Sequence, residues 1–210
     1  MTIYDQRILC FGPRLADAGA RHIVTVGTRA VATNGGRLFG VFKPVIGMSQ
    51  NCVVVITEWL DEAAAKAHAD VALQGVSGAH PIAQDLWEPT ARPLPDEVPT
   101  ETTGFYSHRA FDIRPENWPR FLELSASAWD NFEGVNDTEV KGFWKARKPP
   151  EPGLLRVRLM AWYASLDAWE RSRWWSDNAQ PGQEEAIQRF RERSAMLENN
   201  EVAILTRVMG

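Results

Sequence analysis

The spacing of apolar and polar positions in the second half of the chain predicts a strand followed by a helix. Residues 104–113 are rich in aromatic side chains and lie between Gly104 and Pro115, which is typical of a strand. Pro115 suits the first turn of a helix, and this helix is expected to end near Gly134. Its side chains recur at helical spacing: Trp118, Phe121, Leu122, Leu124, Ser125, Ala128, Trp129 and Phe132.

The rest of this half predicts two further strands, a helical region and a closing strand. A proline-rich turn at 148–153 separates the two strands. Ser165 is a good N-cap for the helix that follows. The expected elements are strands over 140–147 and 154–164, a helix from Ser165 interrupted at 178–182, an amphipathic helix over 183–198 and a strand over 201–208.

The first half contains one segment that fits two structures. The run Ile23-Val24-Thr25-Val26 suggests a strand, whereas a wider set of residues recurs at helical spacing: Leu15, Ala18, His22, Val26 and Ala30. Because the second half has a helix at the matching place, we expect a helix over 14–33. The other expected elements are strands over 37–46, 51–59 and 83–88 and an alanine-rich helix over 61–74.

The two halves match each other at a constant offset of 102 residues. The identities are Tyr4 with Tyr106, Arg7 with Arg109, Pro13 with Pro115, Gly40 with Gly142, and Lys43 with Lys145. They predict a tandem repeat of a β-α-β-β-α-β unit. The expected boundaries are residues 1–88 for the first unit, 89–103 for a proline-rich linker and 104–210 for the second unit.

The repeated Tyr-x-x-Arg strand followed by a proline resembles the opening of NIPSNAP-type domains. The segments Gly142-Phe143-Trp144-Lys145 and 160–171 also resemble that family's second hairpin and helix entry. The resemblance implies the dimeric α+β barrel (ferredoxin-like) superfamily, so the fold class is α+β with two ferredoxin-like repeats forming a pseudo-dimeric barrel. It implies relatives that are cofactor-independent monooxygenases, isomerases, cyclases or lyases acting on small, often aromatic molecules, and some haem proteins.

Composition removes several other classes of function. The net charge is −4 with no long basic run, which argues against a nucleic-acid partner. No apolar stretch approaches the roughly 20 residues of a membrane helix, and the first residues do not resemble a signal peptide. The two cysteines, Cys10 and Cys52, do not form a disulfide scaffold of the secreted type. A cytoplasmic location is therefore expected.

Large rings are concentrated in the second half, which holds seven of the nine tryptophans. Tryptophan fills cores and also lines pockets for flat or apolar ligands. Trp144 and Trp162 are the candidates for pocket walls, and a core role is the alternative for both.

Ionisable residues on the strands of the second half are the candidates for chemistry. His108 shares a strand face with Tyr106 and could act as a general base or acid, with the phenol orienting a substrate. The alternative is a structural histidine. Arg109 could hold a substrate carboxylate or phenolate, or could form a structural ion pair with a helix carboxylate. Arg158 shares a face with Trp162 and contacts ligand only if that face lines a cavity.

The leading hypothesis from the sequence is a cofactor-independent enzyme for a small apolar or aromatic molecule. Its substrate would lie in the second half between sheet and helices, with His108, Tyr106 and Arg158 catalytic and Trp144, Trp162 and Arg109 binding the substrate. The rival is a non-catalytic binding or interaction module. The histidine and cysteine spacings match no metal motif, and His108 is a weak candidate for a haem ligand. A homodimer is a further prediction.

Overall fold

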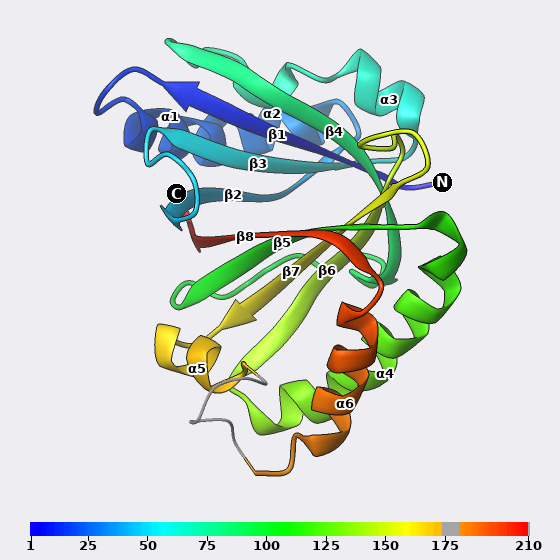
Figure 1. Cartoon of the computed structure of the whole chain (residues 1–210). Helices are drawn as coiled ribbons and strands as arrows, with labels where there is room; N and C mark the ends of the chain where they lie inside the picture. Colours follow the sequence, from blue (N-terminus) through cyan, green and yellow to red (C-terminus); the bar gives the residue numbers. More distant parts are fainter. Residues whose placement is uncertain (174–180, 210) are drawn as a thin grey trace.

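Residues 1–173 and 181–209 are described by a computed structural model, and they form a mixed α+β fold around a closed antiparallel barrel (Figure 1). No helix of this part of the chain is both long and apolar enough to cross a membrane. The eight strands that the structure describes follow the order β1-β3-β2-β8-β5-β7-β6-β4 around the barrel. Their bounds are β1 Ile3–Phe11, β2 Arg37–Ile46, β3 Cys52–Trp59, β4 Ala79–Arg92, β5 Phe105–Ile113, β6 Thr138–Ala146, β7 Leu155–Tyr163 and β8 Leu197–Arg207.

Two seams join the first four strands to the last four. At one seam β2 pairs with β8, so that Phe42 lies opposite Arg207. At the other β4 pairs with β6, so that Trp87 lies opposite Ala146. Both seams are antiparallel, and together they leave the barrel without a free strand edge.

The helices lie outside the barrel on two opposite sides (Figure 1). One side carries α1, α2 and α3, and the other carries α4, α5 and α6. Their bounds are α1 Ala16–His22, α2 Thr28–Thr33, α3 Glu62–Ala67, α4 Trp118–Val135, α5 Leu166–Arg171 and α6 Glu184–Ser194; a π-helical turn over Ile23–Gly27 connects α1 to α2.

Three apolar cores follow from this arrangement. One lies between α1–α3 and the strands of the first half, and a second lies between α4–α6 and the strands of the second half. The third fills the barrel itself with side chains from both halves, including Tyr4, Phe39, Phe42, Trp87, Tyr106, Trp144 and Met160. Successive side chains of a strand point to opposite faces. Each strand therefore contributes alternate side chains to the barrel core and to one outer core.

Gly40 and Gly142 occur where the barrel brings an aromatic ring against the backbone. A side chain at Gly40 would collide with the ring of Phe42, and one at Gly142 with the ring of Trp144. The strand register also shifts at both glycines, as at a β-bulge. This close approach gives a physical reason for the recurrence of glycine at these positions.

The helix expected over 14–33 is confirmed, because α1, the π-helical turn and α2 run together from Ala16 to Thr33. The set of residues that suggested it does not form the packed face: Leu15 and Val26 are 47% and 46% exposed. The buried stripe is shifted along the helix to Ala16, Ala20, Ile23, Gly27 and Val31. Several periodic sets fit one helix, and only contact with the sheet selects among them.

Several predicted boundaries are wrong. The strand expected over 83–88 extends as β4 from Ala79 to Arg92, so the predicted linker begins inside it. It is long because its two ends pair with different neighbours, β1 and β6. The helix expected over 61–74 ends at Ala67, and β8 begins at Leu197 inside the helix expected over 183–198.

The start of the helix expected from Ser165 is confirmed. The Ser165 side chain accepts a hydrogen bond from the backbone N–H of Ala168, as an N-cap does, and α5 then ends at Arg171. The break expected at 178–182 lies partly outside the described residues, because 174–180 are not among them.

Cys10 and Cys52 form a disulfide, a pairing that was not predicted from the sequence. They lie directly opposite each other on β1 and β3, with their Cα atoms 4.1 Å apart. The sequence places them 42 residues apart, and only the pairing of the two strands brings them together.

We predict that reduction of this disulfide lowers the free energy of unfolding. Closing a loop of 42 residues contributes roughly 4 kcal/mol in the chain-entropy relation. Urea unfolding with and without dithiothreitol measures the difference. The double variant Cys10→Ala/Cys52→Ala is the control, since reductant should leave its unfolding midpoint unchanged. An unchanged midpoint for the natural protein under reduction would contradict the prediction.

Candidate functional site

The six residues that the sequence singled out lie on two opposite faces of the sheet. Five of them are among the side chains of the barrel interior: Tyr106, His108, Trp144, Arg158 and Trp162. Arg109 points to the other face, toward α4–α6. The expectation that all six meet between sheet and helices is therefore wrong, because neighbours on one strand face opposite sides.

Inside the barrel, His108 is packed against Arg158. The Arg158 Nη1 group lies 3.3 Å from His108 Nε2, and its guanidinium carbon is 4.6 Å from the centre of the Trp87 ring. Burial, and then the positive charge of Arg158, hold the pKa of His108 well below its usual range. The imidazole is therefore neutral at neutral pH, enclosed by side chains of the barrel core.

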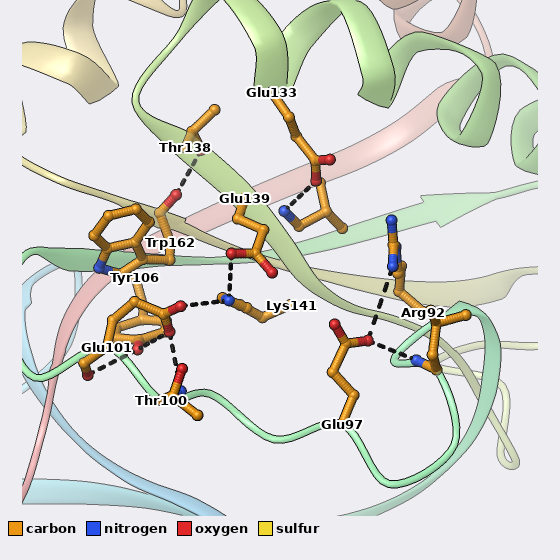
Figure 2. A network of polar contacts seen from close by, with 12 residues as sticks. Arg92, Glu97, Thr100, Glu101, Tyr106, Glu133, Thr138, Glu139, Lys141 and Trp162 are labelled. Atoms are coloured by element: carbon orange, nitrogen blue, oxygen red, sulfur yellow. Dashed lines mark hydrogen bonds and ion pairs between the residues drawn. The ribbon is translucent and has the colours of Figure 1, made fainter.

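Tyr106 and Trp162 are held by the segment that connects β4 to β5. The Tyr106 hydroxyl donates to Glu101 at 3.2 Å, and Glu101 also pairs with Lys141 at 2.5 Å (Figure 2). The Trp162 indole N–H donates to the backbone carbonyl of Thr103 at 2.8 Å. Burial and the charge of Glu101 raise the pKa of Tyr106, so this phenol is a poor proton donor. These bonds give both residues a structural use at one end of the barrel.

A cavity of about 70 Å³ lies on the other face, between the second-half strands and the helices. A single water needs roughly 10–15 Å³ by this measure, so the space suits a few waters or the polar end of a small ligand. About half of its wall is apolar, including Phe111, Trp129, Phe132, Val140, Leu159 and Phe190. Seven polar side chains share it: Arg109, Tyr163, Ser172, Arg173, Arg193, Ser194 and Asn200.

Arg109 reaches this cavity from β5 and is almost completely buried, at 9% exposed. Among the residues that the structure describes, it has neither a carboxylate partner nor a hydrogen bond. Burial, and then the neighbouring charges of Arg173 and Arg193, lower the pKa of Arg109. The protein thus holds a cation in a place that disfavours charge, and a bound anion would relieve this cost.

Arg7, at the matching register position of β1, has the opposite surroundings. Its guanidinium pairs with Asp5 at 3.2 Å and with Asp70 at 2.6 Å. Of the two roles weighed for these arginines, the structural ion pair is present at Arg7, while Arg109 keeps its substrate-binding role as a prediction.

Arg193 enters the cavity from α6 and was not singled out from the sequence. Its guanidinium lies 4.8 Å from the ring centre of Phe190 and donates to the Ser125 hydroxyl at 3.2 Å. Burial, and then Arg173, lower the pKa of Arg193 to about 10. Helical spacing could have identified Arg193 from the sequence. It falls seven residues after Ala186, on the same inward-facing side of α6.

Tyr163 is the acid–base candidate of the cavity, and it too was missed as a site residue. Its hydroxyl accepts a hydrogen bond from Arg173 at 3.0 Å. Burial opposes ionisation of this phenol, but the positive charges of Arg173 and Arg109 outweigh burial and lower its pKa. A phenol that ionises more easily than usual can exchange a proton with a bound molecule.

The barrel is similar in structure to solved proteins whose names refer to a monooxygenase, an anthrone oxidase and chlorite dismutase. A protein from Lactobacillus acidophilus NCFM that is proposed to be a monooxygenase has 12% identity, with 98% of this chain and 93% of that chain covered and a TM-score of 0.63. An anthrone oxidase-like protein has 12% identity, coverage of 99% and 92%, and a TM-score of 0.66. A variant of chlorite dismutase from Candidatus Nitrospira defluvii has 5% identity, coverage of 98% and 91%, and a TM-score of 0.59.

This chain shares the α+β barrel fold of these structures. At such low identities the likeness establishes the fold and nothing finer. No protein-family model matches the sequence, and no curated protein does.

The residues around the cavity do not fit haem, for which the sequence offered His108 as a ligand. Within the described ranges no histidine lines the cavity, and its volume is far below the roughly 300 Å³ at which cofactor pockets begin. His108 lies on the opposite face of the sheet, against Arg158. The described residues also contain no group of three or more histidine, cysteine or acidic side chains placed to hold a metal ion.

We predict that Arg7 and Arg109 respond oppositely to replacement by methionine. Arg7→Met leaves Asp5 buried without its cation, and breaking such a pair costs roughly 3–5 kcal/mol of unfolding free energy. Arg109→Met removes a buried charge that has no carboxylate among the described residues, so stability should be unchanged or rise by about 1 kcal/mol. Urea unfolding of both variants tests this, and equal losses of stability would contradict it.

We also predict that Tyr163 is the first of the three tyrosines to ionise as pH rises. Burial raises the pKa of Tyr4 and Tyr106, whose hydroxyls also face Glu58 and Glu101, whereas the pKa of Tyr163 is lowered. The usual pKa of tyrosine is about 10. The near-ultraviolet band of tyrosinate should therefore appear at a lower pH than is usual for tyrosine. Tyr163→Phe should remove this first step and Tyr4→Phe should leave it. A first step that survives Tyr163→Phe would refute the assignment.

Proposed function

We propose that this protein is a cofactor-independent oxidoreductase of the monooxygenase type, acting on a small aromatic molecule whose polar end enters the helix-side cavity of the second half. The observation that carries the proposal is Tyr163, a buried phenol of lowered pKa in a cavity with aromatic walls and arginine cations. Such a site can remove a proton from an apolar molecule and stabilise the anion that forms.

The reaction begins when Tyr163, as the phenolate, accepts the proton of an acidic O–H group of the substrate and becomes a neutral phenol. Arg109 and Arg193 stabilise the resulting anion by their charge, in a space from which apolar walls exclude water. An electron-rich aromatic anion can give electrons to molecular oxygen directly. For a phenol, one oxygen atom enters the ring at the carbon opposite the hydroxyl and the other leaves as water, so phenol and O2 become quinone and water.

The names of the similar structures favour oxidation over the other reactions of the superfamily. Isomerisation and elimination would begin with the same proton transfer and consume no oxygen. A non-catalytic NIPSNAP-like binding module would bind the molecule without turnover. Haem chemistry is the remaining alternative, and the residues around the cavity disfavour it.

Of the residues predicted from the sequence, Arg109 keeps its proposed role as a substrate-binding residue. Proton transfer, which the sequence assigned to His108, passes in this proposal to Tyr163. Roles for Tyr106, Trp144, Arg158 and Trp162 in the barrel interior remain predictions.

We further propose that the chain holds two copies of a ferredoxin-like unit, which the sequence placed at 1–88 and 104–210, with the linker shortened to the residues between Arg92 and Gly104. In support, the strand order β4-β1-β3-β2 of the first half recurs as β8-β5-β7-β6 in the second. A homodimer and a cytoplasmic location also remain predictions, which sedimentation and cell fractionation would test.

We predict that the purified protein consumes oxygen with phenol or 1-naphthol and forms the corresponding quinone without added cofactor. Tyr163→Phe should slow this by roughly a hundredfold or more, the usual contribution of a general base. Tyr4→Phe is the control, because that phenol is bonded to Glu58 in the first half. An oxygen electrode and quinone absorbance follow the reaction.

Each alternative gives its own result in this assay. A product formed without oxygen uptake indicates an isomerase or lyase. Binding without any product indicates a non-catalytic module, and a Soret band in the purified protein indicates haem. Oxygen uptake that is equal in the natural protein and in Tyr163→Phe would exclude Tyr163 as the base.

A further inference from the structure

We infer that the ligand of the helix-side cavity is an organic carboxylate, selected because Ser107 stands where the first half has an aspartate. The inference rests on the proposed function only in that both use the same cavity. It goes further by naming the charge of the ligand and the position that decides it.

The two halves provide a comparison within one molecule. On β1, Asp5 lies opposite Thr57 of β3, and Arg7 follows two residues later on the same face. On β5, Ser107 lies opposite Ala161 of β7, and Arg109 follows in the same way. The two arginines thus occupy matching places, and the residue beside them on the strand face differs.

This difference removes the internal anion. Asp5 pairs with Arg7 at 3.2 Å and accepts a further hydrogen bond from Gln84 at 3.1 Å. Ser107 is fully buried, and its uncharged hydroxyl lies beside the Tyr163 phenol, whose pKa it helps to lower. A hydroxyl carries no charge to offset the guanidinium, so no carboxylate of the described residues serves Arg109. The Tyr163 phenol beside it is neutral until it ionises, and a bound anion from outside can supply the missing charge.

Arg193 adds a second cation from a different element. Its guanidinium is fixed among the rings of Phe111, Phe121 and Phe190. Its Nη1 bonds to Ser125, and its Nε is buried without a partner in the described part of the chain. Two arginines that reach one cavity from β5 and α6 recognise a carboxylate better than a neutral group, because planar guanidinium edges match its two oxygens.

The walls indicate that the anion carries an apolar body. Phe132, Val140 and Leu159 line the same cavity, and a hydrated inorganic ion gains nothing from such contacts. A carboxylate attached to a small apolar or aromatic group satisfies both the cations and the walls.

Binding of benzoate and benzamide to the full chain, measured by calorimetry, tests the inference, because the two ligands share shape and differ in charge. We expect the natural protein to bind benzoate about tenfold or more tighter, since a charge-assisted hydrogen bond contributes that much. Ser107→Asp should remove this preference by supplying Arg109 with an internal carboxylate, as Asp5 supplies Arg7. Ser107→Asn adds similar bulk without charge and should keep benzoate ahead of benzamide.

Further variants keep the test decisive if Ser107→Asp does not fold. Arg109→Met removes the cation instead and should abolish the preference in the same way. Asp5→Asn changes the charge of the first half only and should leave the preference as it is.

Equal affinity for benzoate and benzamide in the natural protein overturns the carboxylate inference while leaving a small-molecule site in place. Binding of neither ligand also overturns the inference, and oxygen uptake with phenols then decides the proposed function separately. A benzoate preference that persists in both Ser107→Asp and Arg109→Met shows that the anion binds elsewhere, and this too overturns the inference.

Discussion

Closure of the sheet is the constraint on which the rest of this structure depends. Pairing of β2 with β8 and of β4 with β6 turns two four-stranded sheets into one barrel. Each sheet then has an inner face covered by the other half and an outer face covered by helices (Figure 1). Along every strand, alternate side chains must therefore fit the barrel interior and the helix-covered outer face.

This alternation decides where chemistry is available. His108 and Arg109 are adjacent in sequence and lie in separate compartments, one among the rings of the barrel and one beside the cavity. The barrel interior is filled by large side chains from both halves, which stabilises closure and limits room for a ligand. The helix-side compartment of the second half combines a cavity with Arg109, which has no carboxylate partner among the described residues.

The two halves differ most in how they treat a buried arginine. The first half neutralises Arg7 with Asp5, as a stable core requires. The second half places Ser107 in that position and adds Arg193 and Tyr163, so part of its stability is given up around a cavity. Such a cost is typical of functional sites, where local stability is exchanged for binding or reactivity.

The sequence by itself determined the element order, the helix over 14–33, the Ser165 cap and the positions where Tyr, Arg and Gly recur, because these depend on local periodicity and turn chemistry. Only the tertiary structure decided the length of β4, the Cys10–Cys52 bond and which strand face turns toward the barrel interior. It also brought Arg193 and Tyr163 to Arg109. Those features depend on which distant strands and helices come into contact, and local sequence patterns do not specify these long-range contacts.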